Sequence, residues 1–191
     1  MRLIGKFEIK EFDIVKGINF EGVRKIGNAS KTIKKILDKN DFIEEVFLQD
    51  IRASLYDMLI QFEIVEEIVK EFFLPVCVGG GIKKFEDVEK LISLGCERVS
   101  INSCLEDNFD LINKIANHFG SQSISVQLDV VLKDNKIYSF KEYGRELRVT
   151  DTETFLKKCI DNGVGEICMT AIENDGKMLG PNFQILDYLS T

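Results

Sequence analysis

Short apolar runs alternate along the chain with longer stretches in which apolar residues recur at helical spacing. The apolar runs are rich in β-branched and aromatic residues, which is typical of buried strands. The predicted strands are Leu3–Ile9, Glu45–Gln49, Pro75–Val78, Arg98–Ile101, Ile124–Leu128 and Glu166–Met169. The predicted helices cover residues 29–39, 57–73, 84–94, 106–119, 151–162 and 182–189. Because strands and helices alternate with mostly short connections, the pattern predicts parallel strands joined by right-handed crossovers.

Two connections are long enough to be functional candidates on length alone. One covers residues 10–28, after the first predicted strand. The other covers residues 130–150, after the fifth. Within the second, Val130–Leu132 and Ile137–Phe140 flank a polar turn and predict a small β-hairpin inserted after strand five.

The ends of the predicted strands recur at an interval of about 120 residues, which indicates an internal repeat. Glu8 and Asp129, which end the first and fifth strands, are one interval apart, and so are Asp50 and Thr170. Two units of four β/α pairs make an eight-stranded barrel, so we expect an α/β fold of the (βα)8 TIM-barrel family. A complete barrel needs roughly 250 residues, whereas this chain has 191. We therefore expect residues 1–191 to be a single incomplete barrel of six β/α units that is inactive by itself.

Composition excludes several classes of protein. Against 25 Lys and Arg there are 32 Asp and Glu, a net charge of −7, which argues against a nucleic-acid partner. No apolar stretch approaches the roughly 20 residues of a membrane helix, and the N-terminus is not a signal peptide. The five cysteines form no CxxC pair and favour free thiols in the cytoplasm. We expect no metal and no cofactor.

Two neighbouring strand ends favour an anion site. Val78–Ile82 contains three consecutive glycines between a strand and a helix, a pattern that lets backbone amides approach phosphate. The alternative is a tight turn without a ligand. Ser100–Ser103 ends the next strand in small hydrogen-bonding residues. Because adjacent strand ends are neighbours in a barrel, we expect the two loops to share one phosphate.

Three carboxylates end predicted strands, where barrel enzymes place catalytic groups. We expect Asp129 and Glu8 to act as general acid and base, and Asp50 to support them. The alternative for each is an acid that caps a loop. At the opposite strand ends lie two acids and two arginines, which form either a solvated rim or a closed ring of salt bridges. They are Arg2, Glu45, Arg98 and Glu166.

Six short runs together resemble one known family. They are Val15–Arg24, Asp50–Ser54, Val78–Ile82, Val99–Ser103, Gly120–Gln122 and Asn174–Gly176. From Arg2 to the last predicted helix the chain resembles the cyclase subunit family of imidazole glycerol phosphate synthase, a barrel of histidine biosynthesis. The resemblance implies that ammonia enters at the barrel floor from a glutaminase partner. It implies a reaction at the mouth with a phosphoribulosyl-formimino carboxamide ribotide, which yields imidazole glycerol phosphate and aminoimidazole carboxamide ribotide.

The resemblance also assigns roles to individual residues. Asp129 matches one of the family's two catalytic aspartates, whereas Glu8 stands where the other is expected, with its carboxylate one methylene further out. Arg98 replaces the lysine usual in the family's ammonia gate, whose other members match Arg2, Glu45 and Glu166. The residues that match the phosphate loops are Gly80, Gly81, Asn102 and Ser103. The residues that match the barrel mouth are Asp50, Lys16, Thr170 and Asp175.

Glu8 and the loop Ala53–Asp57, which lacks the family's usual Gly-Arg, keep other interpretations open. One is a paralogue that delivers ammonia for sugar amidation in surface-polysaccharide biosynthesis. Another is an ammonia-conducting scaffold without chemistry of its own. A third is the related phosphoribosyl isomerase, against which Asn102–Ser103 and the gate charges argue.

Overall fold

The parallel strands of the molecule form one curved sheet. The computed structural model describes residues 2–56, 58 and 61–190. The parallel strands, in the order in which they pair, are β1 (Ile4–Lys10), β4 (Glu45–Asp50), β5 (Val76–Gly79), β6 (Arg98–Ile101), β7 (Ile124–Lys133) and β10 (Glu166–Ala171). The strands predicted from the sequence overlap these. Among the described strands β1 and β10 do not pair with each other, so the sheet is not closed.

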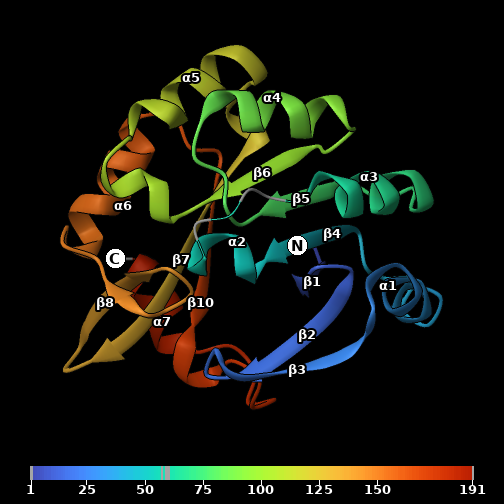
Figure 1. Ribbon diagram of the computed structural model, residues 1–191. Coiled ribbons are helices and arrows are strands. Elements are labelled where there is room, and N and C mark those ends of the chain that lie inside the picture. Colours follow the sequence, from blue (N-terminus) through green and yellow to red (C-terminus); the bar gives the residue numbers. More distant parts are fainter. Residues whose placement is uncertain (1, 57, 59–60, 191) are drawn as a thin grey trace.

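Most of the helices pack against the outside of the sheet, whereas α2 (Ile51–Leu55) lies over its carboxyl edge (Figure 1). The helices are α1 (Ala29–Leu37), α2, α3 (Phe62–Glu71), α4 (Phe85–Ser93), α5 (Asp110–Phe119), α6 (Thr152–Asp161) and α7 (Phe183–Ser190). Single 3-10 turns cover Ser103–Glu106, Ser121–Ser123 and Ile172–Asn174. The helix predicted over 106–119 is thus shorter and begins after a separate turn. Of the helix predicted over 57–73, residues 57 and 59–60 lie outside the described part of the chain.

Residues 10–28 form the long connection between β1 and α1 that was predicted, but its hairpin structure was not predicted. They fold into two antiparallel strands, β2 (Asp13–Ile18) and β3 (Glu21–Asn28), and β2 pairs with the end of β1. The turn between them places Asn19 and Phe20 at positive φ, the backbone of a two-residue hairpin turn. The sequence concealed this hairpin because every residue of β3 except Gly27 is exposed. The strand therefore has no apolar face to read.

A second antiparallel arm extends β7 beyond the barrel strands. β7 pairs with β8 (Lys136–Lys141) from Asp129 onward, and β8 then pairs with β9 (Glu146–Leu147). In Figure 1 this arm projects below α6 on the same side as the end of β7. β7 thus serves both the parallel sheet and the arm, and it carries Asp129 at the point where the two diverge.

The core has two parts. The larger lies between the parallel sheet and the helices and is built from branched aliphatic residues such as Leu48, Val99 and Leu128. The smaller consists of Val15, Phe20, Ile51 and Tyr143, where the tips of the two arms meet α2. No helix in the described part of the chain is long and apolar enough to cross a bilayer.

Candidate functional site

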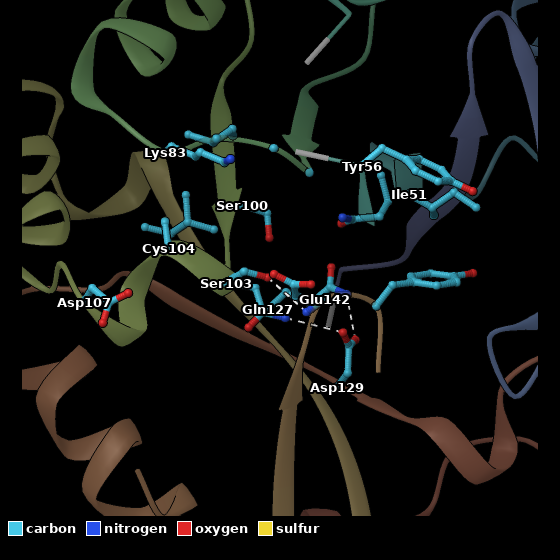
Figure 2. Close-up of a pocket in the computed structure, with 17 residues that line it drawn as sticks. Ile51, Tyr56, Lys83, Ser100, Ser103, Cys104, Asp107, Gln127, Asp129 and Glu142 are labelled. Atoms are coloured by element: carbon cyan, nitrogen blue, oxygen red, sulfur yellow. Dashed lines mark hydrogen bonds between the residues drawn. The ribbon is translucent and has the colours of Figure 1, made fainter. Parts of the chain in front are cut away.

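A cavity of about 660 Å³ opens at the carboxyl ends of β4 to β7. Its walls come from the loop after β5, the end of β6, the inward face of β7 and the turn between β8 and β9. Figure 2 shows the side chains of Ser103, Gln127, Asp129 and Glu142 converging on one side of it. The cavity brings together Gly80, Gly81, Asn102, Ser103 and Asp129, which were predicted separately from the sequence.

The glycines of the loop after β5 are needed for packing. Gly80 and Gly81 have φ of +99° and +73°, a region that other residues rarely adopt. A Cβ at Gly80 would lie 2.1 Å from the carbonyl oxygen of Asp50, and one at Gly81 would lie 2.5 Å from Cβ of Ala53. The turn into α2 therefore excludes a side chain at both positions. The same absence of side chains leaves the backbone of the loop lining the cavity.

Asp129 is the buried carboxylate of this cavity, with 1% of its surface exposed. Gln127 Nε2 donates to Asp129 Oδ1 at 2.8 Å, and Asn102 Nδ2 donates to Oδ2 at 3.4 Å. Burial raises the pKa of Asp129, while the charge of Lys6 opposes that rise and the charge of Glu8 adds to it. Such a carboxyl group is suited to exchanging a proton with a bound ligand.

The second predicted carboxylate belongs to an adjoining cluster of charges. Lys16 Nζ lies 2.9 Å from Glu8 Oε1 and 2.6 Å from Asp175 Oδ1, so β2 links β1 to the loop after β10. Burial disfavours the charge of Lys16, but its bonds to Asp175 and Glu8 outweigh burial and raise its pKa. Lys6 Nζ donates to Thr170 Oγ1 at 3.3 Å and so connects β1 with β10.

Asp50 occupies a different position from the other predicted residues. Asp50 does not line the cavity. Its Oδ1 accepts hydrogen bonds from the backbone N–H groups of Arg52 at 2.9 Å and Ala53 at 3.2 Å, and the residue thereby caps α2. Burial raises the pKa of Asp50, against the effect of these two bonds. In this structure the carboxylate holds the turn that packs on Gly80.

The four charged residues at the amino ends of the strands form a closed ring. Arg2 Nε lies 3.0 Å from Glu45 Oε2, and Arg2 Nη2 lies 2.7 Å from Glu166 Oε2. Arg98 Nη1 lies 3.6 Å from Glu45 Oε1 and also pairs with Glu166. Burial raises the pKa of Glu45, although Arg98 and Arg2 counteract it. Glu45 and Arg98 are buried, while Arg2 and Glu166 reach the surface.

Comparison with known proteins agrees with this arrangement. The family described as histidine biosynthesis protein matches residues 2–191. The chain belongs to this family. This member is 35% identical over 176 residues to the imidazole glycerol phosphate synthase subunit HisF of Dictyoglomus turgidum, covering 92% of the chain and 69% of that protein. It is 35% identical over 192 residues to the subunit HisF of Lactococcus lactis subsp. lactis, covering 100% and 73%.

A further relative carries a more qualified name. It is the putative imidazole glycerol phosphate synthase subunit hisF2 of Campylobacter jejuni, 34% identical over 185 residues, covering 97% of this chain and 73% of that protein. The resemblance to the cyclase family expected from the sequence is confirmed. The family fold is a (βα)8 barrel, and the parallel strands of this member form a sheet of that kind that is not closed.

Several groups of this histidine biosynthesis family member were not predicted from the sequence. Lys6 shares a strand face with Glu8, and Gln127 shares one with Asp129, because residues two apart on a strand point the same way. A polar residue two positions before each predicted carboxylate was therefore a usable signal. No comparable signal marks Tyr143 or Arg148, which reach the site from the arm.

Proposed function

We propose that the chain is an ammonia-using cyclase of the imidazole glycerol phosphate synthase type. Its substrates are a phosphoribulosyl-formimino aminoimidazole carboxamide ribotide and ammonia. Its products are imidazole glycerol phosphate and aminoimidazole carboxamide ribotide. The observation that carries the proposal is a buried carboxylate, Asp129, in the same cavity as the two loops that the sequence predicts to bind an anion. The HisF relatives, about 35% identical along most of the chain, support the same reaction.

In this proposal Gly80, Gly81, Asn102 and Ser103 hold one phosphate of the ribotide. Their place beside Asp129 leaves the rest of the substrate within reach of its carboxyl group, which transfers protons during ring closure. Glu8 is the second acid–base group. It is supported by three residues of the adjoining cluster, Lys16, Thr170 and Asp175. Asp50 supports the site through the turn into α2 that it caps.

We further infer that the ion-pair ring at the other strand ends is an ammonia gate facing a glutaminase partner. Arg2 and Glu166 are accessible to a docked protein, whereas Glu45 and Arg98 close the inner side. Ammonia admitted there would travel along the strands toward Asp129. We also infer that each parallel strand with its following helix is one β/α unit of a barrel, and that β8 and β9 are an insertion after the fifth.

The test is turnover of the ribotide by the full-length protein, with ammonium supplied at high pH in place of the partner. We expect formation of the carboxamide ribotide product, a loss of it in Asp129→Asn, and a gain in Glu8→Asp. The gain is expected because a 1 Å displacement of a reacting group can cost about 100-fold in rate. Absence of turnover in the parent protein would exclude the proposed reaction.

Glu8 also supports a second candidate, a paralogue that supplies ammonia for sugar amidation in surface-polysaccharide biosynthesis. The observation behind it is that Lys16 pairs directly with Glu8 Oε1. This ion pair occupies the oxygen that would otherwise accept a proton from the substrate. Deletion of the gene should then alter the surface glycan, and a glutaminase with a sugar amidotransferase should restore amidation. An unchanged glycan would exclude this candidate. If Asp129→Asn leaves the glycan intact, the chain serves only as a conduit or scaffold.

A further inference from the structure

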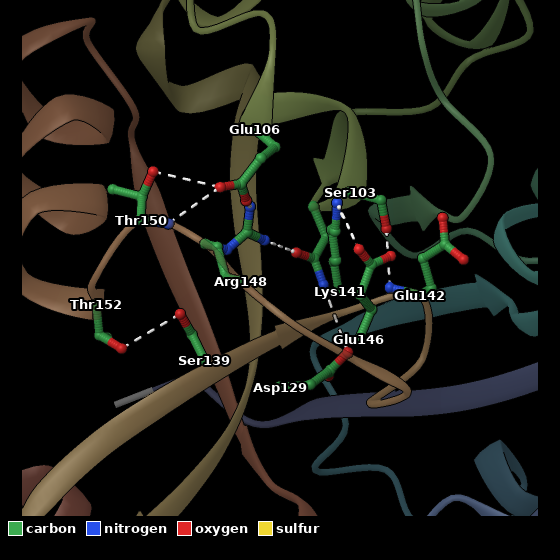
Figure 3. Close-up of polar contacts among 11 residues, drawn as sticks. Ser103, Glu106, Asp129, Ser139, Lys141, Glu142, Glu146, Arg148, Thr150 and Thr152 are labelled. Atoms are coloured by element: carbon green, nitrogen blue, oxygen red, sulfur yellow. Dashed lines mark hydrogen bonds and ion pairs between the residues drawn. The ribbon is translucent and has the colours of Figure 1, made fainter.

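A line of partly buried polar contacts runs from the segment after β9 to Asp129 (Figure 3). Thr150 donates to Glu106 Oε1 through its backbone N–H at 3.1 Å and its hydroxyl at 3.3 Å. Glu106 Oε2 lies 2.7 Å from Arg148 Nη1. Arg148 Nη2 donates to Asn102 Oδ1, and Asn102 Nδ2 donates to Asp129 Oδ2 at 3.4 Å.

Arg148 is fixed in place on every side. Its side chain has no exposed surface, and the guanidinium carbon lies 3.8 Å from the centre of the Phe155 ring. Its backbone N–H donates to the carbonyl oxygen of Ser139 at 2.9 Å. A guanidinium that is paired with a buried carboxylate and stacked on an aromatic ring has one orientation available to it.

This orientation decides which way the Asn102 side chain points. A carboxamide has one accepting end and one donating end, whereas a guanidinium can only donate. The oxygen of Asn102 must therefore face Arg148, and its NH2 group must face Asp129. Without Arg148, only Asp129 orients the carboxamide, and a protonated Asp129 carboxyl group can donate to the Asn102 oxygen as well as accept from its NH2 group.

We propose that Arg148 is a positioning residue of the active site, which locks the Asn102 carboxamide so that it donates to Asp129. The inference rests on the proposed function, in which Asp129 transfers protons and Asn102 contacts the phosphate. It makes the β8–β9 arm part of the catalytic apparatus, because the arm carries Arg148 to the site. The other charged or titratable groups that act on Asp129 are Lys6 and Glu8 of β1 and Tyr143 at the tip of the arm.

The experiment compares Arg148→Met and Arg148→Lys with the parent protein. In ammonium-dependent turnover we expect Arg148→Met to lower kcat about tenfold or more, with KM changed much less, and to move the acidic limb of the pH profile upward. Arg148→Lys keeps the charge but loses the planar guanidinium, so its kcat should lie between those of Arg148→Met and the parent protein. The matched control is Glu146→Gln, which removes an exposed ion pair of the same arm, Lys141–Glu146 at 3.3 Å, and should change neither quantity.

A second variant and a second measurement guard against misfolding and against failure of the proposed function. Arg148→Met combined with Glu106→Leu removes a buried pair of opposite charges together, a change that proteins often tolerate. Titration of the Asp129 carboxyl carbon by NMR needs no turnover. We expect its pKa to rise in both the single and the double variant. If the parent does not turn over the ribotide, the proposed function fails, while the titration still tests Arg148. A folded variant without Arg148 that keeps the parental Asp129 titration overturns the inference.

Discussion

Phe20 and Tyr143 stack ring on ring, with their centroids 4.3 Å apart and their planes inclined by 17°. They occupy the tips of two separate arms, the β2–β3 hairpin and the β8–β9 turn, and both have positive φ, 64° and 56°. Because bulky residues avoid this region, the contact has to offset backbone strain on both sides. Of the two rings, Tyr143 lines the cavity that contains Asp129.

A double-mutant cycle measures this contact. We expect Phe20→Leu and Tyr143→Leu to couple by about 1 kcal/mol in the free energy of unfolding, the range found for stacked aromatic pairs. Urea denaturation provides the measurement. Phe73→Leu, at a fully exposed ring, combined with Tyr143→Leu should be additive and serves as the control. Additivity in the Phe20 cycle as well would mean that the stack contributes no energy of its own.

Alanine variants at Gly80 and Gly22 distinguish the cost of a steric collision from the cost of backbone strain. Both glycines have positive φ, +99° and +60°, but only at Gly80 would a Cβ collide with backbone, whereas at Gly22 it would meet nothing within 4 Å. We expect Gly22→Ala to lower the free energy of unfolding by about 1 kcal/mol, the cost of a left-handed alanine. Gly80→Ala should cost clearly more, about 3 kcal/mol or greater, since α2 must also shift. Equal losses in urea denaturation would contradict the packing role assigned to this loop.

The ion-pair ring should respond to mutation as a buried network. Glu45→Gln leaves Arg98, whose side chain is 9% exposed, without one of its two carboxylates. Because Arg98 keeps Glu166, we expect a smaller loss in the free energy of unfolding than the roughly 3–5 kcal/mol of a buried charge left without a partner, but a clearly measurable one. The control is Glu66→Gln, which breaks the exposed Lys70–Glu66 pair on α3 and should leave the free energy of unfolding nearly unchanged, as expected for a surface pair. Similar losses at the two sites would show that the ring is solvated.

Asp129→Asn is expected to remove a pH dependence from the stability of the protein. Burial raises the pKa of Asp129 in the folded state, so between the unfolded and folded values the folded chain binds more protons. Its contribution to stability is present below the unfolded value and is lost as pH rises through the folded value. The asparagine also places an NH2 group against Asn102 or Gln127, which costs the same at every pH. The urea midpoint of the variant, relative to that of the parent, should therefore be higher at pH 7 than at pH 4.

Asp151 provides the control, because its pKa is shifted in the opposite direction from that of Asp129. The backbone N–H of Thr154 lowers the pKa of Asp151, the exposed cap of α6, so its contribution is present above the unfolded value and lost as pH falls. Asp151→Asn should thus be the less stable variant at pH 7, with the loss vanishing in acid. If both variants shift in the same direction across this range, burial does not govern Asp129.

How far the sequence predicts this molecule depends on whether a segment packs against the core. Strands such as Ile124–Leu128 and helices such as that at 151–162 bury an apolar face, and periodicity located them within a few residues. Strand β3 of the β2–β3 hairpin lies outside the core, and no periodic signal marked it. The strand-end rule placed Asp129 and the two loops in one cavity, since it follows from the geometry of parallel strands.

The parts of the site that escaped prediction come from contacts between distant segments. Arg148 meets Glu106 and Asn102 across more than 40 residues, and only the course of the β8–β9 arm brings them together. Asp50 had the right strand-end position, yet its side chain turns to cap α2 because the helix begins at the next residue. Position on a strand thus indicated where a carboxylate lies, and local capping decided where it points.

Because Gly80 is in close contact with Asp50, the presence of glycine at this position is not evidence that a relative binds phosphate. Any descendant that keeps the turn from β4 into α2 must keep glycine at Gly80, even after losing every phosphate ligand, because the carbonyl of Asp50 leaves no space for a side chain. A lineage that changed its substrate would therefore still carry glycine at this position. No such collision constrains Asn102 and Ser103. A change of substrate should therefore first alter the residues at these two positions.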